Sequence, residues 1–245
     1  MLGRVFFVGG MEDVAKRDQF VSSILFTNWI RSLSEKITIQ SVIIASIDYK
    51  PNGDVIFAKL SVKAFNGPNH EIRPNVVFLR GGSVAVLPLL VSLETNQKYI
   101  IFTKQVRLPV GEVELVEIPA GMLDGDNNFA GVAAKEIQEE TGIIIAPDDL
   151  TPLTPDVAIP ELGPLSFPRA IAVSPGACDE TMRFYLFTKI MPQADIDALT
   201  GKLTGNKEEG ESICLWIVPF EQAAQVTRDG KFFTAYALAR LQGYF

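Results

Sequence analysis

The pattern of hydrophobic and polar residues predicts a helix and a β-hairpin in the N-terminal part of the chain. Over residues 17–36 the apolar positions recur at helical spacing with charged residues around them, which predicts one amphipathic helix. Two β-rich runs follow at residues 37–47 and 55–65, and Pro51 and the Asn52-Gly53 pair between them are typical turn residues. We therefore expect the two runs to pair as a hairpin.

Strand-like and helical patterns alternate over the rest of the chain. Pro88 predicts an edge or interrupted strand, because proline cannot donate a hydrogen bond to a sheet ladder. The order of elements predicts an α/β (α+β) fold, in which residues 79–245 form an α/β/α sandwich with a mixed sheet and residues 1–78 form a small β-rich N-terminal domain. We expect strands at residues 76–79, 84–91, 99–105, 113–118, after Gly142, 182–188 and 213–219, and helices at residues 129–141, 194–200 and 232–242.

The composition excludes several classes of protein. A chain of 245 residues with 47% hydrophobic content buries a sizeable core, so disordered and fibrous structures are excluded. The net charge of −7, with no run of Lys or Arg, argues against a nucleic-acid partner. Cys178, Cys214 and the single His70 are too few for a disulfide framework or a cysteine-type zinc site.

The chain carries no pattern for a membrane span or for secretion. No apolar run reaches the roughly 18 residues needed to cross a bilayer. The apolar stretch at residues 5–8 is shorter than the core of a signal peptide. We expect a cytoplasmic protein, or one in an organelle such as a plastid if a transit segment has been removed.

Three glutamates on one predicted helix carry the densest chemistry in the sequence. Glu136, Glu139 and Glu140 stand at positions i, i+3 and i+4, so their carboxylates share one helix face. Like charges at this spacing destabilise an isolated helix, and a hard divalent cation such as Mg²⁺ or Mn²⁺ relieves the repulsion. The alternative interpretation of the three glutamates alone is a solvated acidic face.

The spacing around these glutamates resembles the Nudix box. That box consists of Gly, five residues, Glu, seven residues, Arg-Glu, an aliphatic residue, any residue, Glu-Glu, any residue, Gly and an aliphatic residue. Two positions depart from it, since Asn127 stands where the family has Glu and Lys135 where it has Arg. The resemblance implies the Nudix fold. The residues in register are Gly121, Glu136, Ile137, Glu139, Glu140, Gly142 and Ile143.

The segments flanking the box resemble one branch of the family, the nucleotide-sugar pyrophosphatases that cleave ADP-ribose, ADP-glucose and related molecules. Residues 103–107, 117–121 and 174–180 look like recurring segments of that branch. The similarity is greatest with plant-type ADP-sugar diphosphatases, and it extends from residues 26–33 to residues 208–211. The resemblance therefore covers most of the chain.

The resemblance also implies roles for single residues. Glu136 and Glu140 would bind metal, with Glu139 beside them and the backbone carbonyl of Ala120 as a further ligand. Glu139 and Glu140 would thus belong to the catalytic set. Glu180, which follows Ser-Pro-Gly, would approach the metals or the attacking water. The alternative for Glu180 is a surface carboxylate on a loop.

Three further residues are candidates for binding substrate. Arg107 and Arg169 would clamp the diphosphate, because a guanidinium donates paired hydrogen bonds to phosphate oxygens. Glu117 would face substrate or metal. For both arginines a surface role is the alternative, and for Glu117 the alternative is a carboxylate at a strand end.

The function expected from the resemblance is hydrolysis of a nucleoside diphosphate sugar, with ADP-glucose or ADP-ribose preferred, to a nucleoside monophosphate and a sugar phosphate. We expect a homodimer in which residues 1–78 contact the partner chain. Two other interpretations stay open. One is a Nudix-fold nucleotide-binding or regulatory module whose chemistry has weakened, suggested by Asn127 and Lys135. The other is a Nudix hydrolase for UDP-sugars, dinucleoside polyphosphates or CoA.

Overall fold

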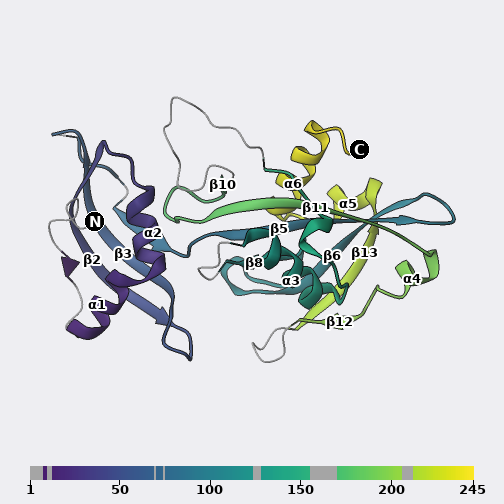
Figure 1. Cartoon of the computed structure of the whole chain (residues 1–245), viewed down its shortest axis with the longest axis horizontal. Coiled ribbons are helices and arrows are strands. Elements are labelled where there is room, and N and C mark those ends of the chain that lie inside the picture. Colours follow the sequence, from purple (N-terminus) through teal and green to yellow (C-terminus); the bar gives the residue numbers. More distant parts are fainter. Residues whose placement is uncertain are drawn as a thin grey trace. The chain divides into compact units, whose positions relative to one another are not determined.

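Contacts between Cα atoms divide the chain of the computed structural model into two units (Figure 1). Unit 1 comprises Met1–Gly82 and Asp156–Met182, and unit 2 comprises Ser83–Pro155 and Arg183–Phe245. A segment from the middle of the sequence therefore groups with the N-terminal residues. The structure describes residues 8–9, 13–68, 70–73, 75–123, 128–154, 170–205 and 212–245.

Two short helices precede the sheet of unit 1. α1 covers Val14–Ser22 and α2 covers Ile24–Ser32, so the prediction of one helix over residues 17–36 is wrong. Ser23 between them has extended backbone angles, and its side chain accepts a hydrogen bond from the Phe26 N–H. A serine hydroxyl that binds the backbone of the next turn ends one helix and caps another, which the apolar spacing alone did not indicate.

The sheet of unit 1 is built on a long hairpin. β2 (Ile37–Tyr49) and β3 (Val55–Asn66) pair antiparallel, which confirms the predicted hairpin. In the turn between them, Gly53 adopts a φ of +90°. β4 (Val76–Leu79) pairs with β3, and β1 (Val8–Gly9) lies parallel to β2.

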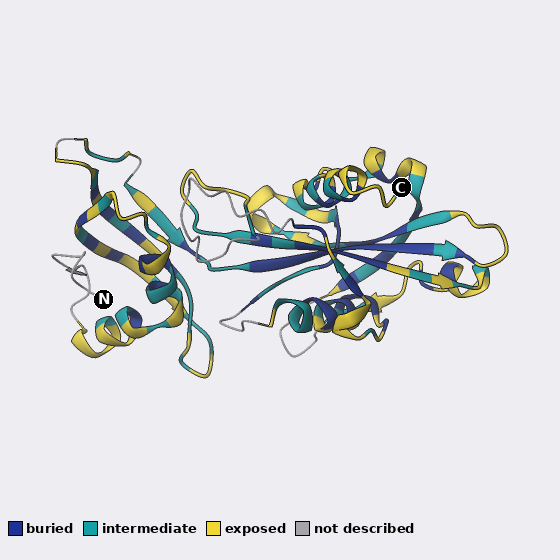
Figure 2. Cartoon of the chain, turned by 45° about the horizontal axis from the view of Figure 1, so that its top comes forward, coloured by how far each residue is buried: buried dark blue, intermediate teal, exposed yellow. Residues whose placement is uncertain are grey.

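The core of unit 1 lies between this sheet and the two helices (Figure 1). Buried and exposed residues alternate along β2 and β3 (Figure 2), as expected for a sheet with one covered face. The rings of Phe20 and Phe26 lie 5.0 Å apart in this core. The core residues are Phe20, Phe26, Trp29, Ile30, Ile39, Val42, Ile44, Ala58, Leu60, Val62, Ala64 and Leu79.

Unit 2 is organised around a larger sheet with helices on both faces. The strand order is β11-β5-β6-β13-β12, while β7 pairs with β6, β8 with β5 and β9 with β11. α3 and α6 lie on opposite faces of this sheet (Figures 1 and 2), which confirms the α/β/α sandwich. The strands are β5 (Ser83–Ser92), β6 (Lys98–Arg107), β7 (Glu112–Glu117), β8 (Ala120–Met122), β9 (Leu150–Pro152), β11 (Thr181–Met191), β12 (Leu203–Thr204) and β13 (Ile213–Pro219); the helices are α3 (Phe129–Thr141), α4 (Gln193–Asp197), α5 (Ala223–Val226) and α6 (Gly230–Leu241).

Pro88 lies in an interior strand of the sheet, so the edge-strand alternative is wrong. β5 stands between β11 and β6 in the strand order. Residues 83–85 of β5 pair with β8, and residues 89–91 pair with β6. Pro88 falls between these two ladders, where its missing N–H removes no bond of either ladder. On this side of β5 the pairing partner changes at Pro88, while the strand itself is continuous over Ser83–Ser92.

The strand predicted after Gly142 is present as β9, but it does not follow the glycine directly. Residues 143–146 have no regular secondary structure, a single 3-10 turn follows at Pro147–Asp149, and the strand β9 begins only at Leu150. Ile143 is nevertheless buried in the core of unit 2. Its apolar character therefore reflects packing, which a short apolar run does not distinguish from strand pairing.

No helix in the described part of the chain is long and apolar enough to span a membrane.

Candidate active site

α3 carries the three glutamates and has the predicted bounds. Asn128 caps its N-terminus, since the side chain accepts a hydrogen bond from the Gly131 N–H at 3.0 Å. Gly142 ends the helix with a φ of +72°, a left-handed conformation that favours glycine. These two caps fix the helix that presents Glu136, Glu139 and Glu140.

Glu136 lies directly against the strand β8. A Cβ atom added to Gly121 would stand 2.0 Å from both Cδ and Oε1 of Glu136. Any larger residue at position 121 would therefore displace this carboxylate or the strand. Ala120 precedes Gly121 in β8, so the structure brings together two of the groups expected to bind metal, Glu136 and the backbone at Ala120.

Glu139 and Glu140 differ in exposure although they are adjacent. Glu140 is buried, with 3% of its surface exposed, whereas the side chain of Glu139 is 31% exposed. Their backbone is held by a distant segment. The N–H of Gly205 donates to the Glu139 carbonyl at 3.1 Å, and the hydroxyl of Thr204 donates to the Glu140 carbonyl at 2.6 Å.

The carboxylates of Glu136, Glu139 and Glu140 have suitable chemistry for a hard cation, but they do not point to one common position. Among the residues that the structure describes, no three His, Cys, Asp or Glu side chains lie close enough together to hold a metal ion. Carboxylate oxygens and a backbone carbonyl are nevertheless the ligands that Mg²⁺ and Mn²⁺ prefer. Binding of such a cation would therefore require these side chains to move from the positions described.

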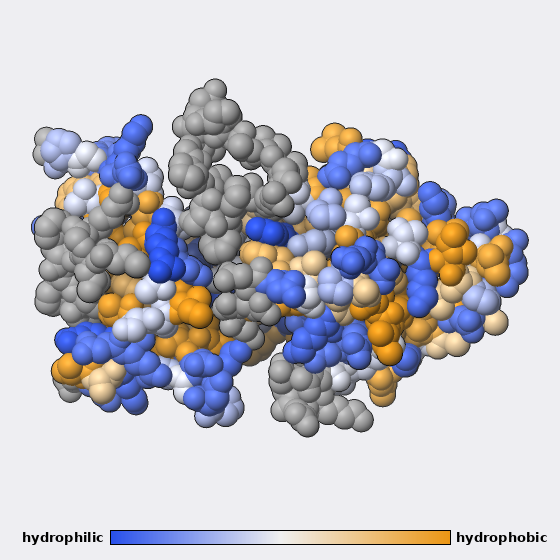
Figure 3. Space-filling view, in the orientation of Figure 1, coloured by the Kyte–Doolittle hydropathy of each residue, from blue (hydrophilic) through white to orange (hydrophobic). Residues whose placement is uncertain are grey.

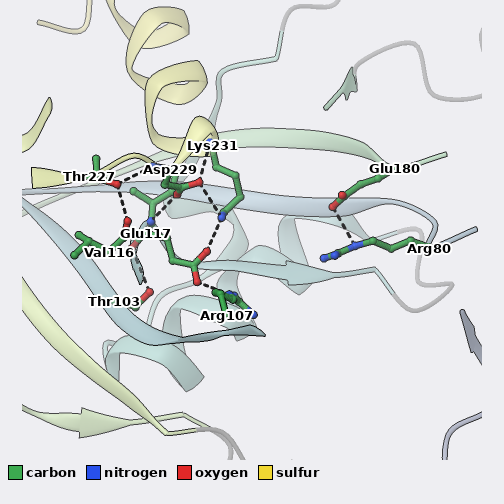
Figure 4. Close-up of polar contacts among 10 residues, drawn as sticks. Arg80, Thr103, Arg107, Val116, Glu117, Glu180, Thr227, Asp229 and Lys231 are labelled. Atoms are coloured by element: carbon green, nitrogen blue, oxygen red, sulfur yellow. Dashed lines mark hydrogen bonds and ion pairs between the residues drawn. The ribbon is translucent and has the colours of Figure 1, made fainter. Parts of the chain in front are cut away.

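A second charged cluster of unit 2 is buried where β6, β7 and the start of α6 meet (Figure 4). The carboxylate of Glu117, whose side chain is 3% exposed, accepts from Arg107 Nε at 2.5 Å through Oε1 and from Lys231 Nζ at 2.7 Å through Oε2. Lys231 Nζ also donates to Asp229 Oδ1 at 3.0 Å. Arg107 and Glu117, both predicted to bind substrate, thus form one ion pair.

The backbone next to Glu117 is tied to the segment that starts α6. Asp229, the N-cap of this helix, accepts from the Ile118 N–H at 3.1 Å. The hydroxyl of Thr227 donates to the Val116 carbonyl at 2.6 Å, as Figure 4 shows. The peptide groups on both sides of Glu117 are therefore fixed by the same short segment.

Lys231 and Asp229 were not identified from the sequence. Burial on its own would lower the pKa of Lys231, but the charges of Asp229 and Glu117 outweigh this effect and raise the pKa above its ordinary value. Lys231 is therefore a cation in the folded chain. The available signal was the Asp-Gly-Lys start of the closing helix, where Asp is a preferred N-cap, but the partners across the fold leave no local pattern.

Glu180 belongs to unit 1 and forms an ion pair there. Its Oε1 lies 3.2 Å from Nε of Arg80. Its neighbour Asp179 accepts from the N–H groups of Arg80 and Gly81 at 2.7 and 3.1 Å, and Cys178 forms a β-bridge with Phe78. The Ser-Pro-Gly segment is thus anchored to the end of β4.

The remaining predicted substrate residue, Arg169, lies outside the described residues, as does Asn127. The predicted roles of the candidate site residues stay predictions.

Comparison with known proteins shows to which family the chain belongs. No family model matches the chain. Over 235 residues the chain is 35% identical to Nudix hydrolase 14, chloroplastic, of Arabidopsis thaliana, and the alignment covers 91% of this chain and 73% of the relative. The chain belongs to the Nudix hydrolase family. The resemblance seen in the box at residues 121–143 is therefore confirmed.

Two further similarities agree with this assignment to the Nudix family. The chain is 27% identical over 186 residues to the ADP-ribose pyrophosphatase of Escherichia coli strain K12, which covers 74% of this chain and 75% of that protein. Among solved structures, a crystal structure of an ADP compounds hydrolase matches with a TM-score of 0.53 and 17% identity, covering 87% of this chain and 99% of that one. The second match supports the fold alone.

As a Nudix box, the helix α3 departs from the family pattern at Lys135. The ammonium group of Lys135 lies 3.4 Å from Oε2 of Glu139, four residues further along the helix. The lysine thus pairs with one of the glutamates expected at the metal site. Both side chains are partly exposed, so the pair contributes only about 0–1 kcal/mol.

Proposed function

We propose that this Nudix hydrolase cleaves the diphosphate bond of a nucleoside diphosphate sugar, with ADP-ribose or ADP-glucose preferred. Water attacks one phosphorus atom, the bridging P–O bond breaks, and the products are a nucleoside monophosphate and a sugar phosphate. The observation that carries the proposal is the close contact of Glu136 with Gly121 beside the buried Glu140, in a chain of this family. The name of the ADP-ribose pyrophosphatase relative supports an ADP-linked substrate.

The residues proposed to hold a divalent cation, Mg²⁺ or Mn²⁺, are Glu136, Glu139, Glu140 and the carbonyl of Ala120. Such a cation supplies positive charge that offsets the diphosphate and activates water for attack. Glu136 lies against Gly121 of β8, next to Ala120, and Glu140 is buried. Glu139 would first have to exchange its ion pair with Lys135 for the cation.

The proposed substrate clamp is Arg107, with Arg169 as a second candidate. Arg107 is 40% exposed while its partner Glu117 is 3% exposed, so the arginine is the member of the pair that can meet a ligand. Glu117 then acts as an anchor for the guanidinium. Glu180 is proposed to assist the attacking water, for which it would have to leave its ion pair with Arg80.

A weakened Nudix module that binds nucleotides without turnover is the second candidate function. The ion pair between Lys135 and Glu139 favours it, because that pair competes with the cation for a carboxylate. The competition is modest for an exposed pair, so we favour the active enzyme.

Product release from a panel of substrates tests the proposal. The panel contains ADP-, UDP- and GDP-sugars, dinucleoside polyphosphates and CoA, each with Mg²⁺, with Mn²⁺ and with EDTA. The expected result is phosphomonoester release from an ADP-sugar that stops in EDTA. If only dinucleoside polyphosphates or CoA were hydrolysed, the substrate would belong to that class and not to the nucleotide sugars. Nucleotide binding without any turnover would favour the weakened module. Full activity in excess chelator would exclude the metal mechanism.

We also propose an oligomeric state and a cellular location. We propose a homodimer in which residues 1–78 contact the partner chain. For location we propose the cytoplasm, or a plastid if a transit segment is removed; the word chloroplastic in the name of the Arabidopsis relative describes that protein.

A further inference from the structure

The charges around Glu117 balance within one buried group. Arg107 and Lys231 supply two positive charges, and Glu117 and Asp229 supply two negative ones. A buried carboxylate without such partners is costly, so both oxygens of Glu117 need a donor in the folded chain. Arg107 satisfies Oε1 and Lys231 satisfies Oε2.

The two cations of this group differ in what they can reach. The side chain of Lys231 is 20% exposed and holds two carboxylates at 2.7 and 3.0 Å. The side chain of Arg107 is 40% exposed and contacts Glu117 through Nε, the nitrogen nearest its aliphatic chain. A guanidinium held at Nε keeps its orientation while its outer edge remains available for an anion.

We propose that Lys231 is a positioning residue that sets the Arg107 guanidinium for the substrate diphosphate by fixing Glu117 between them. The inference rests on the proposed function, because it takes Arg107 as the diphosphate clamp. Lys231 shares the charge of Glu117, so Arg107 is less completely neutralised than it would be in an isolated pair. The C-terminal helix α6 thereby contributes to a site whose candidate residues otherwise come from earlier in the chain.

The geometry of the surrounding backbone supports this role. Because Asp229 holds the Ile118 N–H and Thr227 holds the Val116 carbonyl, the strand end stays in place when only the Lys231 ammonium is removed. Loss of the ammonium should then free the Glu117 side chain without unfolding the strand. The effect should pass through Arg107 and should be absent when Arg107 is absent.

The test uses full-length protein and ADP as a diphosphate probe that needs no turnover. The variants are Lys231→Met, Lys231→Arg and Arg107→Ala, together with the double variant of Lys231→Met and Arg107→Ala. Arg240→Met, an exposed cation at the other end of α6, is the matched control. Calorimetry measures the Kd for ADP and for AMP, thermal unfolding reports folding, and kinetics on the nucleotide sugar separates KM from kcat.

We expect Lys231→Met to weaken ADP binding by about tenfold and AMP binding by less than that, with KM rising more than kcat falls. Lys231→Arg should retain the affinity to within about threefold, and Lys231→Met should have no further effect in the Arg107→Ala background. An unchanged Kd for ADP, an equal loss with and without Arg107, or a wild type that binds no ADP would overturn the inference. If the wild type binds ADP with this pattern but hydrolyses no nucleotide sugar, the proposed function fails and the positioning role of Lys231 stands.

Discussion

Burial distinguishes the glutamates of α3, although the sequence presents them as equivalent. Glu140 is 3% exposed and adjoins the core, Glu136 is confined against Gly121, and Glu139 is partly exposed beside Lys135. A charged group that is buried depends more strongly on its partners than an exposed one. The three substitutions to glutamine should therefore not be equivalent, and Glu140 should be the most sensitive.

Replacing Glu140 by glutamine tests this order. Glu140→Gln keeps the shape of the side chain and removes its charge, so kcat should fall by about 10²-fold or more if the carboxylate holds a catalytic cation. Glu114→Gln, at a side chain that is 73% exposed, is the control and should leave kcat unchanged. Steady-state kinetics with saturating Mg²⁺ measures both, and an unchanged kcat for Glu140→Gln would show that the box register does not place the metal here.

Asp179 should make the stability of the folded chain decrease as the pH rises. Burial raises its pKa, with Glu180 adding to the shift, and the N–H groups of Arg80 and Gly81 only partly oppose it. The folded chain therefore binds this proton more tightly than the unfolded chain does. The stability from Asp179 is fully present below the ordinary pKa of about 3.9 and is lost as the pH rises through the higher folded value.

Two substitutions at Asp179 separate its charge from its hydrogen bonds. Asp179→Asn keeps an acceptor for the Arg80 and Gly81 N–H groups, so it should be more stable than the wild type at pH 7, by a margin that shrinks below about pH 4. Asp179→Ala removes the acceptor and should destabilise by about 1–3 kcal/mol. Urea unfolding at pH 4 and pH 7 measures both, and a less stable asparagine variant at pH 7 would contradict the sign.

At the scale of elements, the sequence predicted best where local signals agree. The helix predicted over residues 129–141 has the bounds of α3, and the strand predicted over residues 213–219 has the bounds of β13. The break at Ser23 was missed because apolar spacing continued through it. The strand expected after Gly142 is β9, and the apolar Ile143 before it packs into the core without strand pairing.

Some residues of the candidate site were also predictable from local sequence, and others were not. The box residues were predictable because their spacing along one helix is fixed in the sequence. The participation of Lys231 was not predictable, since Lys231 is 114 residues from Glu117 in the chain. Contacts at such separation depend on the folded topology, which leaves no periodic pattern in a single sequence.

The contact between α3 and β8 provides a test at the element scale. Gly121→Ala places a Cβ atom 2.0 Å from the Glu136 carboxylate, so the helix or the side chain must shift. We expect kcat/KM to fall by at least about tenfold and Mn²⁺ binding to weaken in calorimetry. Gly230→Ala, whose Cβ atom would meet nothing within 4 Å, is the matched control and should retain activity. Wild-type Mn²⁺ affinity in Gly121→Ala would show that Glu136 does not need this contact.

At the scale of the whole molecule, exposed apolar residues suggest where a second copy binds. Hydrophobic and hydrophilic residues are interspersed on the face shown in Figure 3, which is ordinary for a protein surface. In unit 1, Ile43 pairs with Ser61 and Ser61 pairs with Val76 across three neighbouring strands. Directly paired residues lie on one face of a sheet, so Ile43 and Val76, each 38% exposed, share the face away from Val42 and Ile44 in the core.

The homodimer prediction can therefore be tested by substituting Ile43 and Val76. The wild type should have twice the chain mass in light scattering at micromolar concentration, because partly exposed apolar residues on a sheet face favour pairing with a second copy. Ile43→Lys combined with Val76→Lys adds charge to that face and should raise the dimer Kd by at least about tenfold. Leu241→Lys, an 84% exposed leucine in unit 2, is the control and should leave the mass unchanged. A fully active monomeric wild type would refute the dimer, whereas a stable dimer of the double lysine variant would move the interface to another surface.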